Sequence, residues 1–113
     1  MKEIKAFVRP IKANDVYKAL HAHGFCCMTL TDCEGTGMYT DPDKDFPSLK
    51  FPFMHSKRVK IEIVCIDEEV EPIIEIIREH GKTGHSGDGI VYVSGVDEVY
   101  RIRNNTKGAD VIC

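Results

Sequence analysis

The sequence lacks an apolar run near the ~20 residues that a membrane-spanning helix requires, and no segment typical of a secretory signal peptide opens it. We therefore expect a cytoplasmic protein that does not insert directly into a membrane. The sequence also lacks an excess of basic residues, because 15 Lys and Arg face 18 Asp and Glu, a net charge of −3. Nucleic-acid-binding proteins usually carry a basic footprint, so this balance argues against nucleic acid as a partner.

Cysteine patterns of metal or disulfide frameworks are also missing. The chain has five cysteines, an odd number, and no Cys-x-x-Cys pair. In a reducing compartment such cysteines usually serve as small buried apolar side chains, and we expect that role here. A soft-metal site is the alternative, because Met38, Met54 and His55 flank both ends of one loop, although no standard zinc spacing is present.

What is present is typical of a single globular domain over residues 1–113. Hydrophobic residues make up 42% and charged residues 29% of the chain, as in folded rather than disordered proteins. Apolar and polar residues alternate in four segments, which predicts strands at 4–8, 28–33, 59–66 and 90–93. Helical spacing predicts one helix from an N-cap at Asn14 to Gly24, and another from near Glu69 to Gly81.

The order β-α-β-β-α-β predicts a ferredoxin-like α+β fold, in which an antiparallel sheet carries two helices on one face. The third strand has apolar residues on both sides, with Ile61 and Ile63 on one and Val64 and Ile66 on the other. A lone two-layer domain would leave one of these faces in water. We therefore infer that another subunit covers it.

The segment from 34 to 58, between the second and third strands, is far longer than the ~2–5 residues of a compact hairpin. Its prolines, glycines and acidic residues exclude a strand and a core segment. A loop of this length inside a small domain is usually functional or disordered.

Residues 83–89 read Thr-Gly-His-Ser-Gly-Asp-Gly and connect the second helix to the last strand. The glycines let successive N–H groups converge into a nest that binds anions, typically phosphate. A plain glycine-rich turn is the alternative for this motif alone.

Arg101 and Arg103 flank Ile102 after the last strand. In an extended chain the two guanidinium groups project to one side while Ile102 packs to the other. Two arginines on one side suit a polyphosphate, because each can bind it bidentately. The alternative is a solvated edge that deters strand pairing. Together with the nest, in an acidic protein, the arginine pair favours an anionic ligand.

Over nearly its whole length the chain resembles the PII signal-transduction proteins. The residues that carry the resemblance are Met1-Lys2-Glu3-Ile4, Met28-Thr29, 59–64, Thr83-Gly84, Gly87-Asp88-Gly89 and Arg101-Ile102-Arg103. The resemblance implies the ferredoxin-like fold and a homotrimer with adenine nucleotide (ADP, AMP or ATP) bound in clefts between subunits. It also implies control of a target protein, such as a membrane transporter or an enzyme, through the long loop. This T-loop would span about 35–58, and a C-terminal tail about 104–113.

Position by position, the resemblance assigns ten residues to nucleotide binding: Gly87, Asp88, Gly89, Arg101 and Arg103 at the phosphates, Thr29, Glu62 and Val64 at the adenosine, and Gly35 and Gly37 at the T-loop base. In the trimer, the glycine-rich segment and the T-loop base would belong to neighbouring subunits.

The sequence departs from nitrogen-sensing members at three places. Ile90 stands where those members have a phosphate-binding lysine, and Met38 and Tyr39 stand where they have an arginine and a glutamine. That glutamine helps to hold the magnesium to which 2-oxoglutarate binds. We therefore expect a divergent PII-like protein that binds ADP or AMP at least as well as ATP, with the use of magnesium left open. A nitrogen-regulatory PII protein is the alternative.

An enzyme is the competing class. His85 or Asp88 could serve as a base in phosphate hydrolysis, which would make the protein a weak nucleotide hydrolase. However, the sequence has no Walker lysine, no paired acid cluster for two metals and no activated Ser or Cys. We therefore expect a regulatory protein rather than an enzyme.

Overall fold

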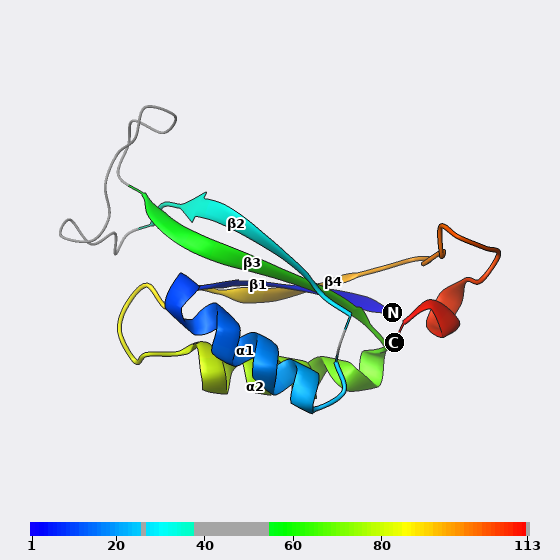
Figure 1. Ribbon diagram of the computed structural model, residues 1–113, viewed down its shortest axis with the longest axis horizontal. Coiled ribbons are helices and arrows are strands. Elements are labelled where there is room, and N and C mark those ends of the chain that lie inside the picture. The colour runs from blue at the N-terminus through cyan, green and yellow to red at the C-terminus, as the bar shows by residue number, and fades with distance from the viewer. Residues whose placement is uncertain (26, 38–54, 113) are drawn as a thin grey trace.

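The computed structural model describes residues 1–25, 27–37 and 55–112, which form a four-stranded antiparallel sheet with two helices on one face (Figure 1). The elements are β1 (Lys2–Val8), α1 (Pro10–Ala22), β2 (Thr29–Gly35), β3 (Ser56–Cys65), α2 (Val70–Gly81) and β4 (Val91–Gly95). Short 3₁₀ turns precede α2 (Asp67–Glu69) and close the described chain (Gly108–Val111). This order confirms the predicted ferredoxin-like α+β fold.

The central strands of the sheet are β1 and β3, in the order β2-β3-β1-β4. They pair antiparallel, with Glu3 opposite Val64 near one end and Phe7 opposite Lys60 near the other. Glu3 and Phe7 therefore mark opposite ends of the central strand β1.

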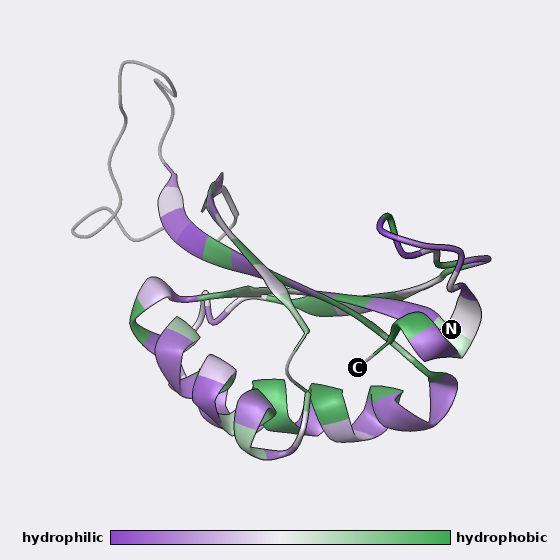
Figure 2. Ribbon diagram, turned by 45° about the vertical axis from the view of Figure 1, so that its right-hand side comes forward, coloured by the Kyte–Doolittle hydropathy of each residue, from purple (hydrophilic) through white to green (hydrophobic). Residues whose placement is uncertain are grey.

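The base of the T-loop is built by β2 and β3, where Gly35 pairs with Ser56. Both strands extend further toward the loop than the predicted 28–33 and 59–66, because their pairing continues past the alternating apolar residues. Figure 2 shows hydrophilic bands along this end of β3, which reads Ser56-Lys57-Arg58. Residues 38–54, with Met38, Tyr39 and Met54, lie outside the described residues.

The first helix begins at Pro10, so the predicted N-cap at Asn14 was wrong. Arg9 is the N-cap residue, with extended backbone angles and no side-chain cap bond. Proline suits the first helical position, because its fixed φ is helical and its missing N–H would have been unpaired there. The second helix has Pro72 in its first turn, where proline is tolerated for the same reason.

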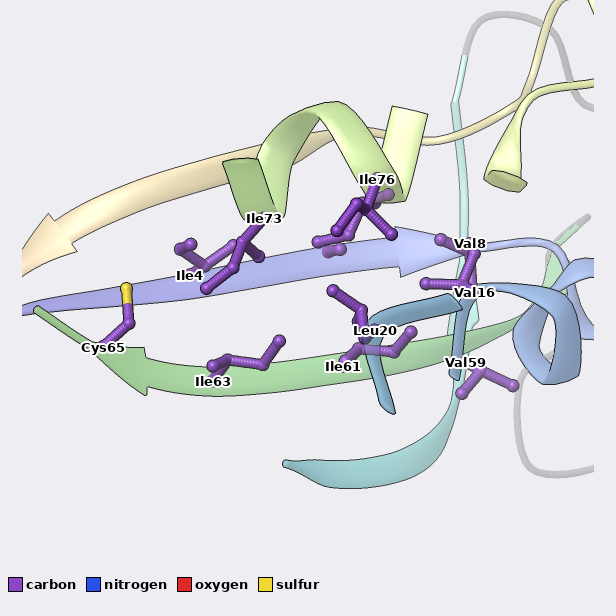
Figure 3. Close-up of a cluster of buried hydrophobic side chains, with 12 residues drawn as sticks. Ile4, Val8, Val16, Leu20, Val59, Ile61, Ile63, Cys65, Ile73 and Ile76 are labelled. Carbon is purple, nitrogen blue, oxygen red and sulfur yellow. The ribbon is translucent and has the colours of Figure 1, made fainter. Parts of the chain in front are cut away.

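The core lies between the helices and the sheet (Figure 3). Alternate residues of β1 and β3 point into it and meet apolar residues of both helices, and each fully buried valine, leucine or isoleucine contributes about 1.5–3 kcal/mol. The buried set is Ile4, Ala6, Val8, Val16, Leu20, Val59, Ile61, Ile63, Cys65, Ile73, Ile76 and Ile77.

The cysteines follow the expectation only in part. Cys65 is a buried core residue, and burial raises the pKa of its thiol. Cys33 is a free, half-buried thiol 3.6 Å from the carbonyl oxygen of Arg58. Cys27 is disulfide-bonded, so the expectation of a reduced apolar side chain was wrong there.

The face of the sheet away from the helices is mixed in character. On β3 it carries Lys60 and Glu62, which form an ion pair of 2.9 Å, beside the half-buried Val64. Ile66 lies beyond the end of the strand. The prediction that this strand is apolar on both faces was therefore wrong, and it gives little support to a covering subunit.

Candidate ligand-binding site

Asp88 organises the glycine-rich segment (residues 83–89). Its carboxylate accepts hydrogen bonds from the Thr83 hydroxyl at 2.6 Å, the Thr83 backbone N–H at 2.8 Å and the Gly84 backbone N–H at 3.0 Å. The guanidinium of Arg9 adds an ion pair at 2.9 Å. The segment is thus wrapped around one carboxylate, which fixes its shape.

These contacts also set the charge of Asp88. Partial burial favours the neutral acid, but the hydrogen bonds from Thr83, Arg9 and Gly84 prevail and hold the pKa of this carboxyl well below its usual range. Asp88 is therefore ionised at neutral pH, and its charge would repel an anionic ligand. Its side chain shapes the segment by accepting from the N–H groups of Thr83 and Gly84, and the backbone N–H groups at 87–89 are the ones suited to an anion.

Glycines give the segment its backbone path. Gly84, Gly87 and Gly89 all have positive φ, at 90°, 90° and 101°, in the left-handed range that glycine adopts without steric cost. Gly89 also passes against β1, where the Phe7 N–H donates to the carbonyl oxygen of Ile90 at 2.9 Å. The segment is therefore tied to the end of the central strand.

A cavity of about 520 Å³, which we call the loop-root pocket, lies between the T-loop base and the glycine-rich segment. Gly35 and Gly37 line it from one side, and Gly87, Asp88 and Gly89 line it from the other. The expectation that these two segments belong to neighbouring subunits was wrong, because one chain brings them to the same pocket.

Arg58 also lines the loop-root pocket, although it is not among the ten residues assigned from the sequence. Its Nη2 donates to the carbonyl oxygen of Gly87 at 2.8 Å, and its Nη1 to that of Lys57 at 3.1 Å. The signal that could have indicated it is a basic residue on the strand that directly follows the T-loop.

A second cavity of about 350 Å³, the tail pocket, brings together the three residues expected at the adenosine. Thr29, Glu62 and Val64 line it with residues of the C-terminal segment such as Val99. None of the three lines the loop-root pocket.

The arginine pair lies in the C-terminal segment beyond β4. The Arg101 backbone N–H donates to the Thr106 carbonyl oxygen at 2.9 Å, and its guanidinium donates to the Asp110 carbonyl oxygen at 3.2 Å. Arg103 is exposed. Ile102 is fully exposed too, so the prediction that it packs on the side opposite the two guanidinium groups is not met within the described chain, because the backbone bends here instead of continuing as a strand.

The two pockets lie at different ends of the sheet. On β1, Glu3 lines the tail pocket and Phe7 lines the loop-root pocket, and four residues of extended strand span ~13 Å. Figure 1 shows the C-terminal segment leaving the sheet at the end opposite the T-loop base. One chain therefore places five of the ten assigned residues at the loop-root pocket and three at the tail pocket, whereas Arg101 and Arg103 line neither and lie in the C-terminal segment.

The described residues hold no cluster of three or more His, Cys, Asp or Glu side chains that could bind a metal ion. His55 is buried at the T-loop base, with its Nε2 3.4 Å from a Glu34 carboxylate oxygen. The other members of the soft-metal alternative, Met38 and Met54, lie outside the described residues. Within the same ranges, no helix combines the length and apolar character needed to cross a membrane.

Comparison with known proteins decides the family. A family model described as "Nitrogen regulatory protein P-II" matches residues 1–106. The chain belongs to this PII family. Similar proteins include nitrogen regulatory proteins P-II of Rhizobium meliloti strain 1021 (37% identity over 99% of this chain and 100% of that protein) and Azospirillum brasilense (38%, 99% and 100%). Nitrogen regulatory protein P-II 2 of Methanothermobacter thermautotrophicus is 38% identical over 99% of this chain and 97% of its own.

Membership confirms the prediction of a PII signal-transduction protein and of a regulatory role rather than an enzymatic one. Proteins of this family generally form homotrimers, bind adenine nucleotide effectors and interact with target proteins. The hydrolase alternative is therefore not supported. The relatives' names support the nitrogen-regulatory alternative, which the departures at positions 38, 39 and 90 had made less favoured.

Proposed function

We propose that this chain forms a cytoplasmic homotrimer that binds an adenine nucleotide between adjacent subunits and controls a target protein through its T-loop. The single observation that carries the proposal is the separation of the two groups of residues. Gly87 and Gly89 line the loop-root pocket, whereas the tail pocket is lined by residues of the C-terminal segment that carries Arg101 and Arg103. A nucleotide that uses both groups needs the loop-root pocket of one subunit and the tail of the next.

The chemistry of the two groups suits the two ends of a nucleotide. Backbone N–H groups and a guanidinium at the loop-root pocket suit phosphate. Apolar Val64 together with Thr29 and Glu62 suits a base and a ribose, because the site then offers one apolar surface and two hydrogen-bonding groups. The arginine pair would close over the phosphates from the neighbouring subunit.

We expect ADP or AMP to bind at least as well as ATP. Ile90 lines the loop-root pocket and is 67% exposed, so position 90 supplies no cation for an outer phosphate. Isothermal titration of the three nucleotides, with and without magnesium, tests the proposal. Binding of none of them at high micromolar concentration would reject it.

The T-loop would transmit the signal, because a ligand at its base can stabilise one loop arrangement over another. This requires only that the ligand's affinity differ between the two arrangements. We expect the target to be a membrane transporter or an enzyme. Affinity capture with the full chain, with and without ADP, would identify targets whose retention depends on nucleotide.

A nitrogen-regulatory role is the second candidate, and the names of the relatives favour it. It requires that the protein bind 2-oxoglutarate, whereas we expect no appreciable binding, because Tyr39 cannot offer magnesium an amide oxygen. Titration of 2-oxoglutarate in the presence of MgATP separates the two. Strong, nucleotide-dependent binding of 2-oxoglutarate would support the nitrogen-regulatory role instead.

A further inference from the structure

Arg58 lies at the wall of the loop-root pocket, and among the described residues no carboxylate pairs with it. It lies on β3 next to the T-loop base, and its side chain is half-buried. Its two hydrogen bonds go to the carbonyl oxygens of Gly87 and Lys57. No ion pair within 4.0 Å involves it among the described residues. A guanidinium has five N–H donors, so these bonds leave donor capacity for a ligand.

Arg9, another arginine near the segment, is in a different situation. Its Nε is paired with the Asp88 carboxylate at 2.9 Å, and its Nη2 donates to the Ser86 carbonyl oxygen at 2.9 Å. Its charge is therefore compensated, and it does not line the loop-root pocket. Of the described cations, Arg58 is the one that lines this pocket.

The hydrogen bond to the Gly87 carbonyl oxygen holds the Arg58 side chain against the glycine-rich segment. Gly87 begins the Gly-Asp-Gly turn, and Arg58 lines the same pocket as that turn, so an anion bound in the pocket could meet both the guanidinium and the backbone N–H groups of the turn. A partly desolvated cation is stabilised when an anion contacts it and the backbone N–H groups at the same time. The planar guanidinium can bind a phosphate bidentately.

We propose that Arg58 is a phosphate-binding residue of this site and that it contacts the second phosphate of a nucleoside diphosphate. The inference rests on the proposed function and adds the residue that makes affinity depend on phosphate number. Arg58 then supplies, from the chain that forms the loop-root pocket, a positive charge for the second phosphate of ADP. AMP has no second phosphate and gains no such contact. The site would accordingly bind ADP more tightly than AMP.

The test is isothermal titration of Arg58→Gln, Lys57→Gln and the unmodified protein with AMP and with ADP. Lys57 is the matched control, because it is the adjacent residue on β3, carries the same charge, is exposed and does not line the pocket. For Arg58→Gln we expect ADP affinity to fall about tenfold or more, the size of a lost charge-assisted hydrogen bond. AMP affinity should fall less than about threefold, and Lys57→Gln should change neither by more than about twofold.

Three results would overturn the inference. Equal losses of AMP and ADP affinity would mean that Arg58 acts on the pocket's shape and not on the second phosphate. Unchanged ADP affinity in Arg58→Gln would mean that it does not contact the ligand. If the unmodified protein binds neither nucleotide, the proposed function fails as well, which distinguishes that result from the other two. If Arg58→Gln does not fold, Arg58→Lys, which keeps the charge, is used in its place. Arg58→Lys should still prefer ADP over AMP, but less strongly than the unmodified protein.

Discussion

Gly89 passes so close to β1 that a Cβ built on it would lie 1.8 Å from the carbonyl oxygen of Phe7. Its φ of 101° is also in the range that only glycine adopts easily. The glycine-rich segment is therefore fixed to the central strand at a place where no side chain fits, and this contact forms one wall of the loop-root pocket.

Gly89→Ala should consequently lower the free energy of unfolding by about 2 kcal/mol or more, because strain and a backbone clash add. Gly84→Ala is the matched control. Gly84 has a positive φ as well, but its Cβ would meet nothing within 4 Å, so we expect only about 1 kcal/mol. Urea unfolding of both variants measures the difference. Equal losses of unfolding free energy in the two variants would show that backbone strain alone, and not the contact with Phe7, determines the effect.

Asp88 should make stability depend on pH in the acid range. Its pKa is lower in the folded protein than in the unfolded chain, where it is about 3.9. The ionised carboxylate therefore stabilises the folded state above pH ~4, and this contribution is lost as the pH falls toward the folded-state pKa.

We expect the free energy of unfolding of Asp88→Asn to be lower than that of the unmodified protein by about 1–3 kcal/mol at neutral pH. This difference in free energy of unfolding should become smaller as the pH drops below ~4. Thermal unfolding across this pH range measures it. Asp97→Asn is the control, because Asp97 is exposed and no hydrogen bond involves it among the described residues. A gap for Asp88→Asn that stays constant down to pH ~3 would contradict the assignment of its stabilising role to the charge.

Arg101→Ala and Arg103→Ala should each weaken nucleotide binding by roughly 1–3 kcal/mol, the value of a hydrogen bond to a charged group. Arg101 also donates to the Asp110 carbonyl oxygen, so its removal should loosen the tail slightly. Arg103 is exposed and should affect binding without affecting stability. Calorimetric titration, with unfolding curves alongside, separates the two effects. Unchanged affinity in both variants would reject the arginine pair as part of the site.

Ile90→Lys should shift nucleotide preference toward ATP, because it adds a cation at the rim of the loop-root pocket. The side chain of Ile90 is 67% exposed, so a lysine can be accommodated with little loss of packing. We expect the ratio of ATP to ADP affinity to rise about tenfold, as for one added charge-assisted contact. Competition titrations give the ratio directly, and an unchanged ratio would show that position 90 does not face the phosphates.

The fold was predictable because its signals are local. Alternation in β1 and β3 and helical spacing in α2 reflect burial on one side of each element, and the structure reproduces these elements within a few residues. The start of α1 was missed because Asn14 looked like a cap, whereas Pro10 already fits the first helical position.

The assignment of the ten residues to nucleotide binding stays a prediction, and their arrangement in the chain could not be predicted from the sequence. Pairing of β2 with β3 and docking of Gly89 on β1 place the T-loop base and the glycine-rich segment on one pocket. Both are long-range contacts, which no local pattern reveals. For the same reason, the sequence does not distinguish Arg58 from the neighbouring Lys57, whereas the structure does so through the bond of Arg58 to Gly87.

The central claim is that two chains complete each site, and mixed trimers test it most directly. One variant, Gly37→Glu, places a negative charge in the loop-root pocket, where a Cβ meets nothing within 4 Å and fits without strain. The other carries Arg101→Ala and Arg103→Ala. Each variant alone should bind no ADP at concentrations that saturate the unmodified protein. Trimers assembled from both chains contain one interface at which an intact loop-root pocket meets an intact arginine pair. Titration of purified mixed trimers should therefore recover binding at one site per trimer, with the affinity of the unmodified protein. If mixed trimers bind no better than either variant alone, while both variants fold and assemble normally, each chain must hold its nucleotide by itself and the account is wrong.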